Sequence, residues 1–282
     1  MRALIAGAGY VGAALAARLV AGGHEVIALR RSAAAPPAGV RAFRADLGAP
    51  GALDALPELD LVFYTAAADE RSDAAYERAY VTGVARVVEY LARRTNPARR
   101  LLFTSSTAVY AQQYGEWVDE ASPCEPSGFA GRRLLEGEAL LRAAPFPATV
   151  LRLGGLYGPG RASLIERARS GATRIASGPS RYTNRIHRDD AAFALAHLAA
   201  LPEAAACYVG VDCEPARETD VLGWLAQRLG ASPPCAEDTR TAATVGRSSK
   251  RCSNARLLAT GFRFRYPSYR EGYEALLGEL AA

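Results

Sequence analysis

The amino-acid sequence predicts an α/β fold built on a doubly wound, mostly parallel sheet. Apolar runs of strand length alternate with amphipathic stretches of helix length over the first 155 residues, as in consecutive βαβ units. One such run, Leu61–Tyr64, is apolar almost throughout, as expected for a parallel strand buried on both faces. After about residue 156, Pro, Gly and Ser separate shorter elements. We therefore expect a large domain over residues 1–155 and a smaller, interleaved lobe over residues 156–282 that does not fold independently.

The individual elements follow from local hydrophobic patterns and end signals. Helices are expected where apolar residues recur three or four apart, and Gly22-Gly23 and Asn96-Pro97 end two of them. Asp189-Asp190 is expected to cap a further helix, and Glu120 to cap a turn. The expected strands lie at residues 4–6, 26–29, 41–45, 61–64, 101–103, 149–153 and 207–211. The expected helices lie at residues 11–21, 74–94, 128–143, 190–201 and 219–229.

A glycine-rich turn directly follows the first expected strand. Gly7, Gly9 and Gly12 have the spacing G-x-G-x-x-G, with Tyr10 and Val11 before the last glycine. In a Rossmann-type unit the first glycine permits a tight turn, the second lets a pyrophosphate approach the backbone, and the third lets the helix pack close to the strand. The helix N-terminus then binds the phosphates through its free amides. A purely structural glycine turn is the alternative, but the position between strand and helix favours dinucleotide binding.

Two arginines stand where a site for NAD would carry an acidic residue. That residue would bind the ribose 2′-hydroxyl about 20 residues after the glycines, and this chain has Arg30 and Arg31 there, followed by Ser32. Guanidinium groups suit a 2′-phosphate, so the sequence favours NADP (NADPH) over NAD, with a solvated basic turn as the alternative. Asp46, before Leu47, ends the third strand, where it could bind the adenine amino group or be an ordinary loop aspartate.

Small and polar residues follow several other strands. Because ligands of doubly wound sheets bind at the carboxyl ends of the strands, we expect these residues to line the same crevice as the glycine turn. They are Thr65, Ala66, Ala67, Ser105, Leu153 and Gly154.

Composition excludes several other classes of function. The net charge is +5, but the charges are scattered and Lys250 is the only lysine, so no nucleic-acid-binding patch is expected. Five cysteines without a C-x-x-C pair and three histidines predict no metal site. No apolar run reaches about 18 residues and no signal peptide is visible. We expect a cytoplasmic monomer or homodimer that binds a small-molecule substrate, with no nucleic-acid or membrane partner.

Several segments resemble the extended short-chain dehydrogenase/reductase superfamily, in particular its NAD-dependent epimerase/dehydratase group. They are the glycine turn Gly7–Gly12 and the segments Thr104–Tyr110, Leu153–Gly160 and Arg185–Asp190. The tail Lys250–Leu257, followed by Gly261-Phe262, is similar to an atypical branch typified by YeeZ. The resemblance covers nearly the whole chain and implies a cofactor-binding fold with a substrate lobe.

The resemblance also implies catalytic residues, and here the chain departs from the family. In the family a Ser or Thr orients the substrate oxygen, and a Tyr-x-x-x-Lys pair supplies the proton donor and a lysine at the nicotinamide ribose. Matching the motifs places the serine at Ser106, the tyrosine at Phe129 and the lysine at Arg133. Gly246 stands four residues before Lys250, so no Tyr-x-x-x-Lys pair exists in this chain. Arg133 would keep a positive charge near the cofactor.

The favoured function is therefore an NADP(H)-binding oxidoreductase of the epimerase/dehydratase type with a non-standard proton donor. Its substrate is expected to be a small carbonyl compound or an imine, and a protonated imine would need less help from a donor. General acid–base catalysis is worth about 10²–10⁴-fold, and phenylalanine cannot provide it. Ser106, Tyr110, Tyr157 or an ordered water could be the donor, and each tyrosine could instead be a packed aromatic.

Two other functions stay open. One is a non-catalytic sensor or scaffold that binds NADP, which the joint loss of the Tyr and the Lys favours. The other is a redox-neutral epimerase or isomerase that uses a bound cofactor. Asn184 and Arg185 are expected to contact the substrate with Ser106 and Tyr157, and the resemblance implies that Arg185 holds an anionic group. Pairing of Arg185 with a neighbouring aspartate is the alternative, and His187 is expected to be structural.

Overall fold

The computed structural model describes residues 1–31, 35–96, 98–171, 174–176, 180–237 and 248–281. Ser32, one of the expected cofactor residues, lies outside these ranges. The chain forms two compact units, and each is assembled from three segments. Unit 1 comprises residues 1–109, 124–153 and 191–208. Unit 2 comprises residues 110–123, 154–190 and 209–282.

A seven-stranded parallel sheet with the order β12-β7-β5-β4-β1-β2-β3 forms the centre of unit 1. The strand order reverses at β1, as in a doubly wound sheet, so the predicted fold class is confirmed. Its central strands are fully buried because their residues are apolar on both faces. The strands are β1 (Arg2–Ala6), β2 (Glu25–Arg30), β3 (Val40–Arg44), β4 (Leu61–Tyr64), β5 (Arg100–Ser106), β7 (Ala148–Leu153) and β12 (Cys207–Gly210).

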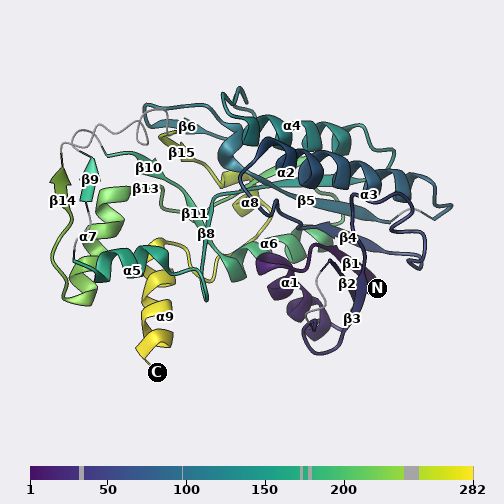
Figure 1. Ribbon diagram of the computed structural model, residues 1–282, viewed down its shortest axis with the longest axis horizontal. Helices are drawn as coiled ribbons and strands as arrows, with labels where there is room; N and C mark the ends of the chain where they lie inside the picture. Colours follow the sequence, from purple (N-terminus) through teal and green to yellow (C-terminus); the bar gives the residue numbers. More distant parts are fainter. Residues whose placement is uncertain (32–34, 97, 172–173, 177–179, 238–247, 282) are drawn as a thin grey trace. The chain divides into compact units, whose positions relative to one another are not determined.

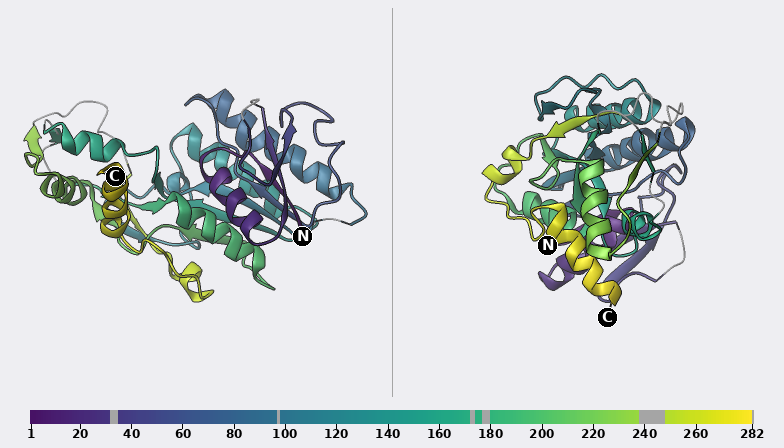
Figure 2. Two further views of the ribbon diagram at one scale, coloured as in Figure 1. Left: turned by 90° about the horizontal axis from the view of Figure 1, so that it is seen from below. Right: turned by 90° about the vertical axis from the view of Figure 1, so that its left-hand side faces the viewer.

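Helices cover both faces of this sheet, α3 and α4 on one side and α1 and α6 on the other (Figure 1). The two further views of Figure 2 again show helices on both sides. Arg18 of α1 lies 4.0 Å from the ring centroid of Phe193 in α6, which joins the second pair. The helices are α1 (Tyr10–Ala21), α2 (Asp73–Glu77), α3 (Gly83–Ala92), α4 (Phe129–Arg142) and α6 (Arg188–Ala200).

The single helix expected over residues 74–94 is interrupted by a π-helical segment, Arg78–Thr82. The Tyr64 hydroxyl donates a hydrogen bond to the Ala79 carbonyl, which competes with the helix for that acceptor. Gly83 begins α3, and a Cβ at this position would lie 2.3 Å from the Tyr64 hydroxyl. The wide turn therefore follows from a buried tyrosine of β4 that inserts into the helix.

Unit 2 is built from short strand pairs around four helices. Its core is a cluster of apolar and aromatic residues that includes Tyr157, Tyr269 and Tyr273. The strands, which pair as β6-β15, β8-β11, β9-β14 and β10-β13, are β6 (Glu116–Val118), β8 (Gly155–Tyr157), β9 (Arg174–Ala176), β10 (Tyr182–Thr183), β11 (Arg185–His187), β13 (Ala216–Arg217), β14 (Cys235–Glu237) and β15 (Lys250–Cys252). The helices are α5 (Ser163–Arg169), α7 (Glu218–Leu229), α8 (Ala255–Ala259) and α9 (Tyr269–Ala281).

Two expected capping roles were wrong. Helix α6 begins at Arg188, so Asp189 and Asp190 lie in its first turn, and the His187 Nδ1 accepts from the Asp189 amide at 3.2 Å. The Asp190 carboxylate is buried and accepts from the amides of Arg265 (2.7 Å) and Tyr266 (2.9 Å). These partners lie some 75 residues away, beyond any local pattern.

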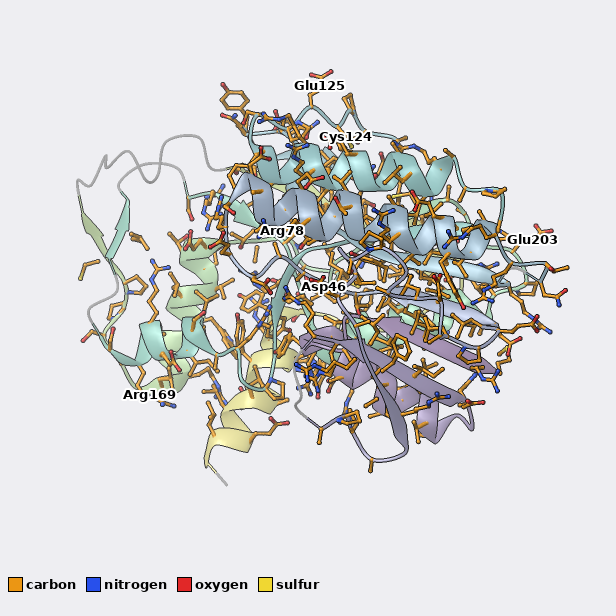
Figure 3. The ribbon with its side chains drawn as sticks, turned by 45° about the vertical axis from the view of Figure 1, so that its right-hand side comes forward. Asp46, Arg78, Cys124, Glu125, Arg169 and Glu203 are labelled. Atoms are coloured by element: carbon orange, nitrogen blue, oxygen red, sulfur yellow. The ribbon has the colours of Figure 1, made fainter. Side chains whose placement is uncertain are left out.

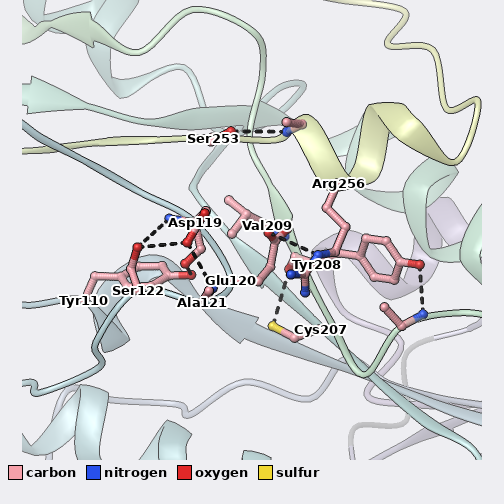
Figure 4. A network of polar contacts seen from close by, with 12 residues as sticks. Tyr110, Asp119, Glu120, Ala121, Ser122, Cys207, Tyr208, Val209, Ser253 and Arg256 are labelled. Atoms are coloured by element: carbon pink, nitrogen blue, oxygen red, sulfur yellow. Dashed lines mark hydrogen bonds and ion pairs between the residues drawn. The ribbon is translucent and has the colours of Figure 1, made fainter.

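Glu120 does not cap a turn either. Its Oε1 accepts from the Val209 amide at 2.8 Å and its Oε2 lies 3.5 Å from the Arg256 Nε (Figure 4). Its side chain is 4 % exposed, so the buried carboxylate joins the loop after β6 to Val209 and to helix α8.

Candidate cofactor site and active site

The glycine turn between β1 and α1 has the geometry of a dinucleotide cradle. Gly7 has φ +99°, and a Cβ there would lie 2.3 Å from the Ala66 Cα. A Cβ on Gly12 would lie 2.5 Å from the Gly7 carbonyl oxygen and 2.7 Å from the Thr65 Oγ1. A Cβ on Gly9 would meet no atom within 4 Å. Gly7 and Gly12 are thus required for packing, whereas Gly9 faces open space in which a pyrophosphate fits.

The N-terminus of α1 is suited to bind anions. No side chain caps it, and its first turn carries no acidic residue. The expected cofactor residues Tyr10 and Val11 are its first two residues. A helix of 12 residues presents amide groups and a partial positive charge at this end, so the cradle fits the phosphates of a dinucleotide.

The other expected cofactor residues of unit 1 follow neighbouring strands of the sheet. Thr65 follows β4, and its hydroxyl donates to the Gly7 carbonyl at 2.8 Å. Since β5, β4, β1, β2 and β3 are consecutive in the sheet, the residues at their carboxyl ends form a continuous row. That row contains Ser105, Thr65 with Ala66 and Ala67, the glycine turn, Arg30 with Arg31, and Asp46 with Leu47.

A basic group lies at the ends of β2 and β3. Arg31 forms an ion pair with Asp69, and this hydrogen bond raises the pKa of the guanidinium further. Arg44, which the sequence reasoning missed, pairs with Arg30 in register and donates from Nε to the Arg31 carbonyl at 3.2 Å. The signal that could have found it is the basic residue at the end of the third strand. This group suits a phosphate bound at the edge of the cradle.

Asp46 lies in the loop after β3 (Figure 3). Its Oδ1 accepts from the Gly48 amide at 2.9 Å, a local turn that leaves the carboxylate exposed. Binding of adenine by Asp46 and Leu47 remains a prediction.

Phe129 and Arg133, at the positions expected for the family's Tyr and Lys, lie on the first turns of α4. The Phe129 ring contacts the Tyr76 ring edge-to-face, with centroids 5.3 Å apart. Arg133 binds both carboxylate oxygens of Asp73, at 2.8 and 3.1 Å, and Glu136 at 2.9 Å. Neither residue offers a proton. Tyr76, which the sequence reasoning missed, brings a phenol to the neighbourhood of Phe129, and its spacing of four from Tyr80 on one helix was the available signal.

Ser105 and Ser106 end β5 and have different surroundings. Ser105 is buried and donates to the Glu138 Oε1 at 2.7 Å, and Glu138 also binds Arg152 through both oxygens, at 3.0 and 2.7 Å. The Ser106 Oγ accepts from the Ala108 amide at 3.1 Å. Ser105 is therefore held by a buried ion pair, and Ser106 is the more accessible hydroxyl at this strand end.

The two tyrosines named as possible donors lie in unit 2 and are buried. Tyr110 is 2 % exposed, and its hydroxyl donates to the Asp119 carbonyl at 2.8 Å. Tyr157 is 4 % exposed, and burial strongly raises its pKa. A Cβ on Gly272 would lie 1.9 Å from the Tyr157 hydroxyl, which therefore points at helix α9. Both tyrosines have the packed-aromatic geometry that was the alternative to a donor.

Asn184 and Arg185 also make internal contacts in unit 2. The Asn184 amide donates to the Lys250 carbonyl at 2.9 Å and accepts from the Cys252 amide at 2.7 Å. Arg185 is 5 % exposed and donates from Nη2 to the Thr183 hydroxyl at 2.6 Å. Leu153 is buried, and the Gly154 amide donates to the Gly210 carbonyl at 3.0 Å. The substrate and cofactor roles of these residues stay predictions.

Two buried ionisable groups near Arg185 have perturbed pKa values. Burial raises the pKa of Asp212 to about 8, against the opposing effect of Arg185. Burial lowers the pKa of His187 to about 4, in keeping with the expected structural role, since its ring packs on Tyr157 and Tyr266. Sequence reasoning missed Asp212 because no motif marks it.

No group of three His, Cys, Asp or Glu side chains within the described residue ranges could hold a metal ion. None of the helices in these ranges combines the length and apolar character needed to cross a membrane.

Most of the chain matches the sequence profile of a known protein family. The profile of the NAD dependent epimerase/dehydratase family matches residues 3–207, so the protein belongs to that family and the predicted resemblance is confirmed.

Relatives of known activity and structure support the same placement. A 3-diazoavenalumate denitrifying reductase from a Streptomyces species is 33 % identical, over 96 % of this chain and 99 % of its own length. A 2-alkyl-3-oxoalkanoate reductase from Stenotrophomonas maltophilia is 31 % identical, over 80 % of this chain and 74 % of its own. A solved structure from Methylobacillus flagellatus, described as an NAD-dependent epimerase/dehydratase, is 37 % identical with a TM-score of 0.79, covering 100 % and 99 % of the two chains.

Structural neighbours bind both forms of the cofactor. Human epimerase family protein SDR39U1, solved with NADPH, has a TM-score of 0.78 at 22 % identity, and covers 96 % of both chains. The Bordetella bronchiseptica enzyme WbmG, solved with NAD and UDP, has a TM-score of 0.81 at 18 % identity, covering 98 % of this chain and 93 % of its own. At these identities the likeness shows the fold, which serves either nicotinamide cofactor.

Proposed function

We propose that the protein is an NADPH-dependent reductase. The compound that accepts the hydride would need no proton from the side chain at position 129, which is Phe129 in this chain. When bound in the cradle of unit 1, the reduced nicotinamide would supply a hydride. The glycine turn and the arginines at the end of β2 would hold its pyrophosphate and 2′-phosphate. Ser106 would orient the acceptor. Two of the curated relatives are named as reductases, which supports reduction over a redox-neutral reaction.

The packing of Phe129 carries this proposal. Its ring is fixed edge-to-face against Tyr76, and Arg133 is occupied by two carboxylates, so the family's proton donor is absent while the cradle is intact. Hydride transfer to a neutral ketone leaves an alkoxide that must be protonated. Hydride transfer to an iminium ion leaves a neutral amine. A diazonium carbon that accepts hydride loses N₂ and leaves a neutral product, so neither acceptor needs a tyrosine.

The name of the Streptomyces relative fits this acceptor class. That enzyme is a denitrifying reductase of a diazo compound and matches this chain from end to end. We infer that the present protein reduces an acceptor that is cationic at the reacting centre or carries its own leaving group. A small ketone remains within the proposal if Tyr76 or water provides the proton.

The test is a turnover assay with NADPH and three acceptor classes, namely a preformed iminium ion, an aryl diazonium ion and a ketone. We expect deuterium from [4-²H]NADPH in the product of one of the first two. Gly9→Ala is the matched control, because it should abolish cofactor binding while leaving the free protein folded. Tight NADPH binding without label transfer to any class would overturn the reductase proposal.

Phe129→Tyr distinguishes acceptors that need a proton from those that do not. The variant places a phenol beside Arg133, whose charge would stabilise the phenolate. We expect ketone reduction to rise by about 10²-fold, while reduction of an iminium or diazonium ion changes less than about twofold. An equal effect on all three acceptors would contradict the proposed reason for the missing tyrosine.

NADP preference is the second part of the proposal. Charge-assisted hydrogen bonds to phosphate are worth about 1.5–3 kcal/mol, so Arg30→Gln and Arg31→Gln should each weaken NADPH binding by roughly tenfold to a hundredfold and leave NADH binding unchanged. Arg41→Gln, an exposed arginine of β3, is the control. Isothermal titration with both cofactors measures the difference, and equal losses for NADPH and NADH would overturn the preference.

A non-catalytic NADP sensor is the second candidate, and the same loss of the proton donor favours it. It predicts NADPH binding without turnover and a protein partner that is captured only in the presence of the cofactor. Any measured turnover that Ser106→Ala abolishes, with NADPH affinity unchanged, would exclude it.

A further inference from the structure

Unit 2 carries a stack of alternating arginine and aromatic side chains, here called the arginine–aromatic ladder and defined as Trp117, Arg251, Tyr182 and Arg217. The Arg251 guanidinium carbon lies 5.1 Å from the Trp117 ring centroid and 5.0 Å from that of Tyr182. The Arg217 guanidinium carbon lies 5.5 Å from the Tyr182 ring centroid. Each arginine is thus within cation–π range of an aromatic face.

Strand register builds the ladder. Trp117 of β6 is the direct partner of Arg251 of β15, and Tyr182 of β10 is the direct partner of Arg217 of β13. The four strands lie side by side in Figure 1, and contacts between β10 and β15 join the two pairs. Backbone pairing therefore fixes each half of the ladder, and the packing of β10 against β15 brings the two halves together.

The positive charge of the ladder is not compensated within the described residues. No carboxylate in these ranges lies within 4.0 Å of the Arg251 or Arg217 guanidinium, and Arg251 uses its Nε on the Gly115 carbonyl at 2.7 Å. The nearby Glu218 is occupied by Arg167 and Arg181. Two guanidinium groups therefore keep N–H donors available for an anion.

The ladder also exposes an aromatic face. Trp117 is 58 % exposed, although indole is among the side chains that gain most from burial. Arg217 is exposed at the opposite end, while Tyr182 and Arg251 are half-buried. A flat apolar surface beside two uncompensated cations is complementary to a flat anion, whose ring or conjugated chain stacks while its carboxylate binds the guanidinium groups.

We propose that the arginine–aromatic ladder binds a planar carboxylate. This binding does not depend on the proposed reductase function. Two of the curated relatives are named for carboxylate compounds, an avenalumate and an oxoalkanoate, which agrees with this chemistry. A nucleotide could also combine a planar ring with an anion, and the experiment separates the two.

Tryptophan fluorescence of the full chain provides the test. The chain has two tryptophans, so Trp224→Phe leaves Trp117 as the sole reporter. Trp224 packs against Tyr269, which is not part of the ladder. We expect a saturable change of Trp117 emission on titration with cinnamate. Cyclohexanepropionate, which is not planar, and cinnamide, which is neutral, should each require at least about tenfold higher concentrations.

Variants of the ladder complete the experiment. Arg251→Gln should weaken cinnamate binding by about tenfold or more, and Arg217→Gln by about threefold. Arg217 is exposed, so this second variant keeps the test valid if Arg251→Gln does not fold. Arg99→Gln, an exposed arginine of unit 1, should have no effect.

Three results would overturn the ladder as a carboxylate site. They are equal binding of cinnamate and cinnamide, unchanged cinnamate binding in both ladder variants, and saturable binding of UDP without binding of cinnamate. Because none of these measurements involves hydride transfer, failure of the ladder is distinguishable from failure of the reductase assay.

Discussion

Each unit of this protein buries an arginine near a carboxylate, and the two arrangements differ in how completely they are hydrogen-bonded. In unit 1 the Glu138 carboxylate accepts from Arg152 through both oxygens and also from Ser105. In unit 2 the Asp212 Oδ1 accepts from the Glu214 amide at 3.2 Å. Its Oδ2 and the Nη1 of the neighbouring Arg185 have no hydrogen-bond partner among the described residues.

The difference shows why burial alone does not determine the charge of a group. A buried ion pair is retained when every oxygen and N–H is satisfied, because the hydrogen bonds offset the cost of desolvation. A buried carboxyl group with an unsatisfied oxygen has a lower free energy in its neutral, protonated form. The pKa of Asp212 is raised accordingly to about 8. Unit 1 thus uses its pair to hold Ser105 at the strand end, whereas unit 2 contains a group that can titrate near neutral pH.

The largest expected loss of stability comes from breaking the Arg152–Glu138 ion pair of unit 1. Arg152→Met leaves Glu138 buried without its bidentate partner, which should lower the free energy of unfolding by about 3–5 kcal/mol in urea denaturation. Arg142→Met is the control, because Arg142 is 55 % exposed and lies 3.6 Å from the same carboxylate, so its loss should cost no more than about 1 kcal/mol. Adding Glu138→Met to Arg152→Met should restore most of the stability. Equal losses for the two arginines would contradict the comparison.

The second effect is a pH dependence that belongs to unit 2. A carboxyl group whose pKa is raised on folding binds its proton more tightly in the folded state, so its contribution to stability is lost as the pH rises towards about 8. His187, with a pKa lowered to about 4, acts in the opposite sense but only below about pH 6.5. The charged or titratable groups that interact with Asp212 include Asp190, Glu214, Tyr157, Arg185, Cys213 and Tyr273.

Between pH 6.5 and 8 the wild-type protein should therefore lose about 2 kcal/mol of stability, at roughly 1.4 kcal/mol per pH unit. Asp212→Asn, which mimics the neutral acid, should make urea denaturation independent of pH in this range. Asp220→Asn on the exposed first turn of α7 should leave the slope unchanged. A slope that survives Asp212→Asn would show that another group titrates.

The smallest expected change in stability concerns two tyrosine hydroxyls. One is hydrogen-bonded, and the other has no hydrogen-bond partner among the described residues. The Tyr90 hydroxyl in unit 1 accepts from Arg94 at 2.7 Å and bonds to the Pro57 carbonyl at 3.1 Å, so Tyr90→Phe should cost about 0.5–1.5 kcal/mol. The buried Tyr157 hydroxyl has no partner among the described residues, so Tyr157→Phe should be neutral or slightly stabilising. A loss of activity in Tyr157→Phe without a loss of stability would instead support its predicted role in catalysis.

The fold was predictable to the extent that it depends on local patterns. Most strands of the sheet are apolar runs that bury both faces, and their bounds lie within one or two residues of those expected. The exceptions are β5, which ends three residues later than expected, and β3, which is largely exposed. The π-helical segment at residues 78–82 was not predictable, because it depends on a hydroxyl from β4 that reaches a helical carbonyl 15 residues away. The roles expected for Asp190 and Glu120 failed for the same reason, since their partners lie 75 and more residues away in the chain.

For the candidate site, the sequence by itself determined the glycine turn, the arginines at the end of β2 and the absence of the Tyr-x-x-x-Lys pair, because spacing and residue counts need no coordinates. Only the tertiary structure decided that Arg44 joins those arginines, that Glu138 holds Ser105, and that Asp212 is buried with an unsatisfied oxygen. The physical reason is that hydrogen bonding and desolvation depend on which side chains meet across the fold. The ladder of Trp117, Arg251, Tyr182 and Arg217 is such a case, since two strand pairs and the packing of β10 against β15 bring its four segments together.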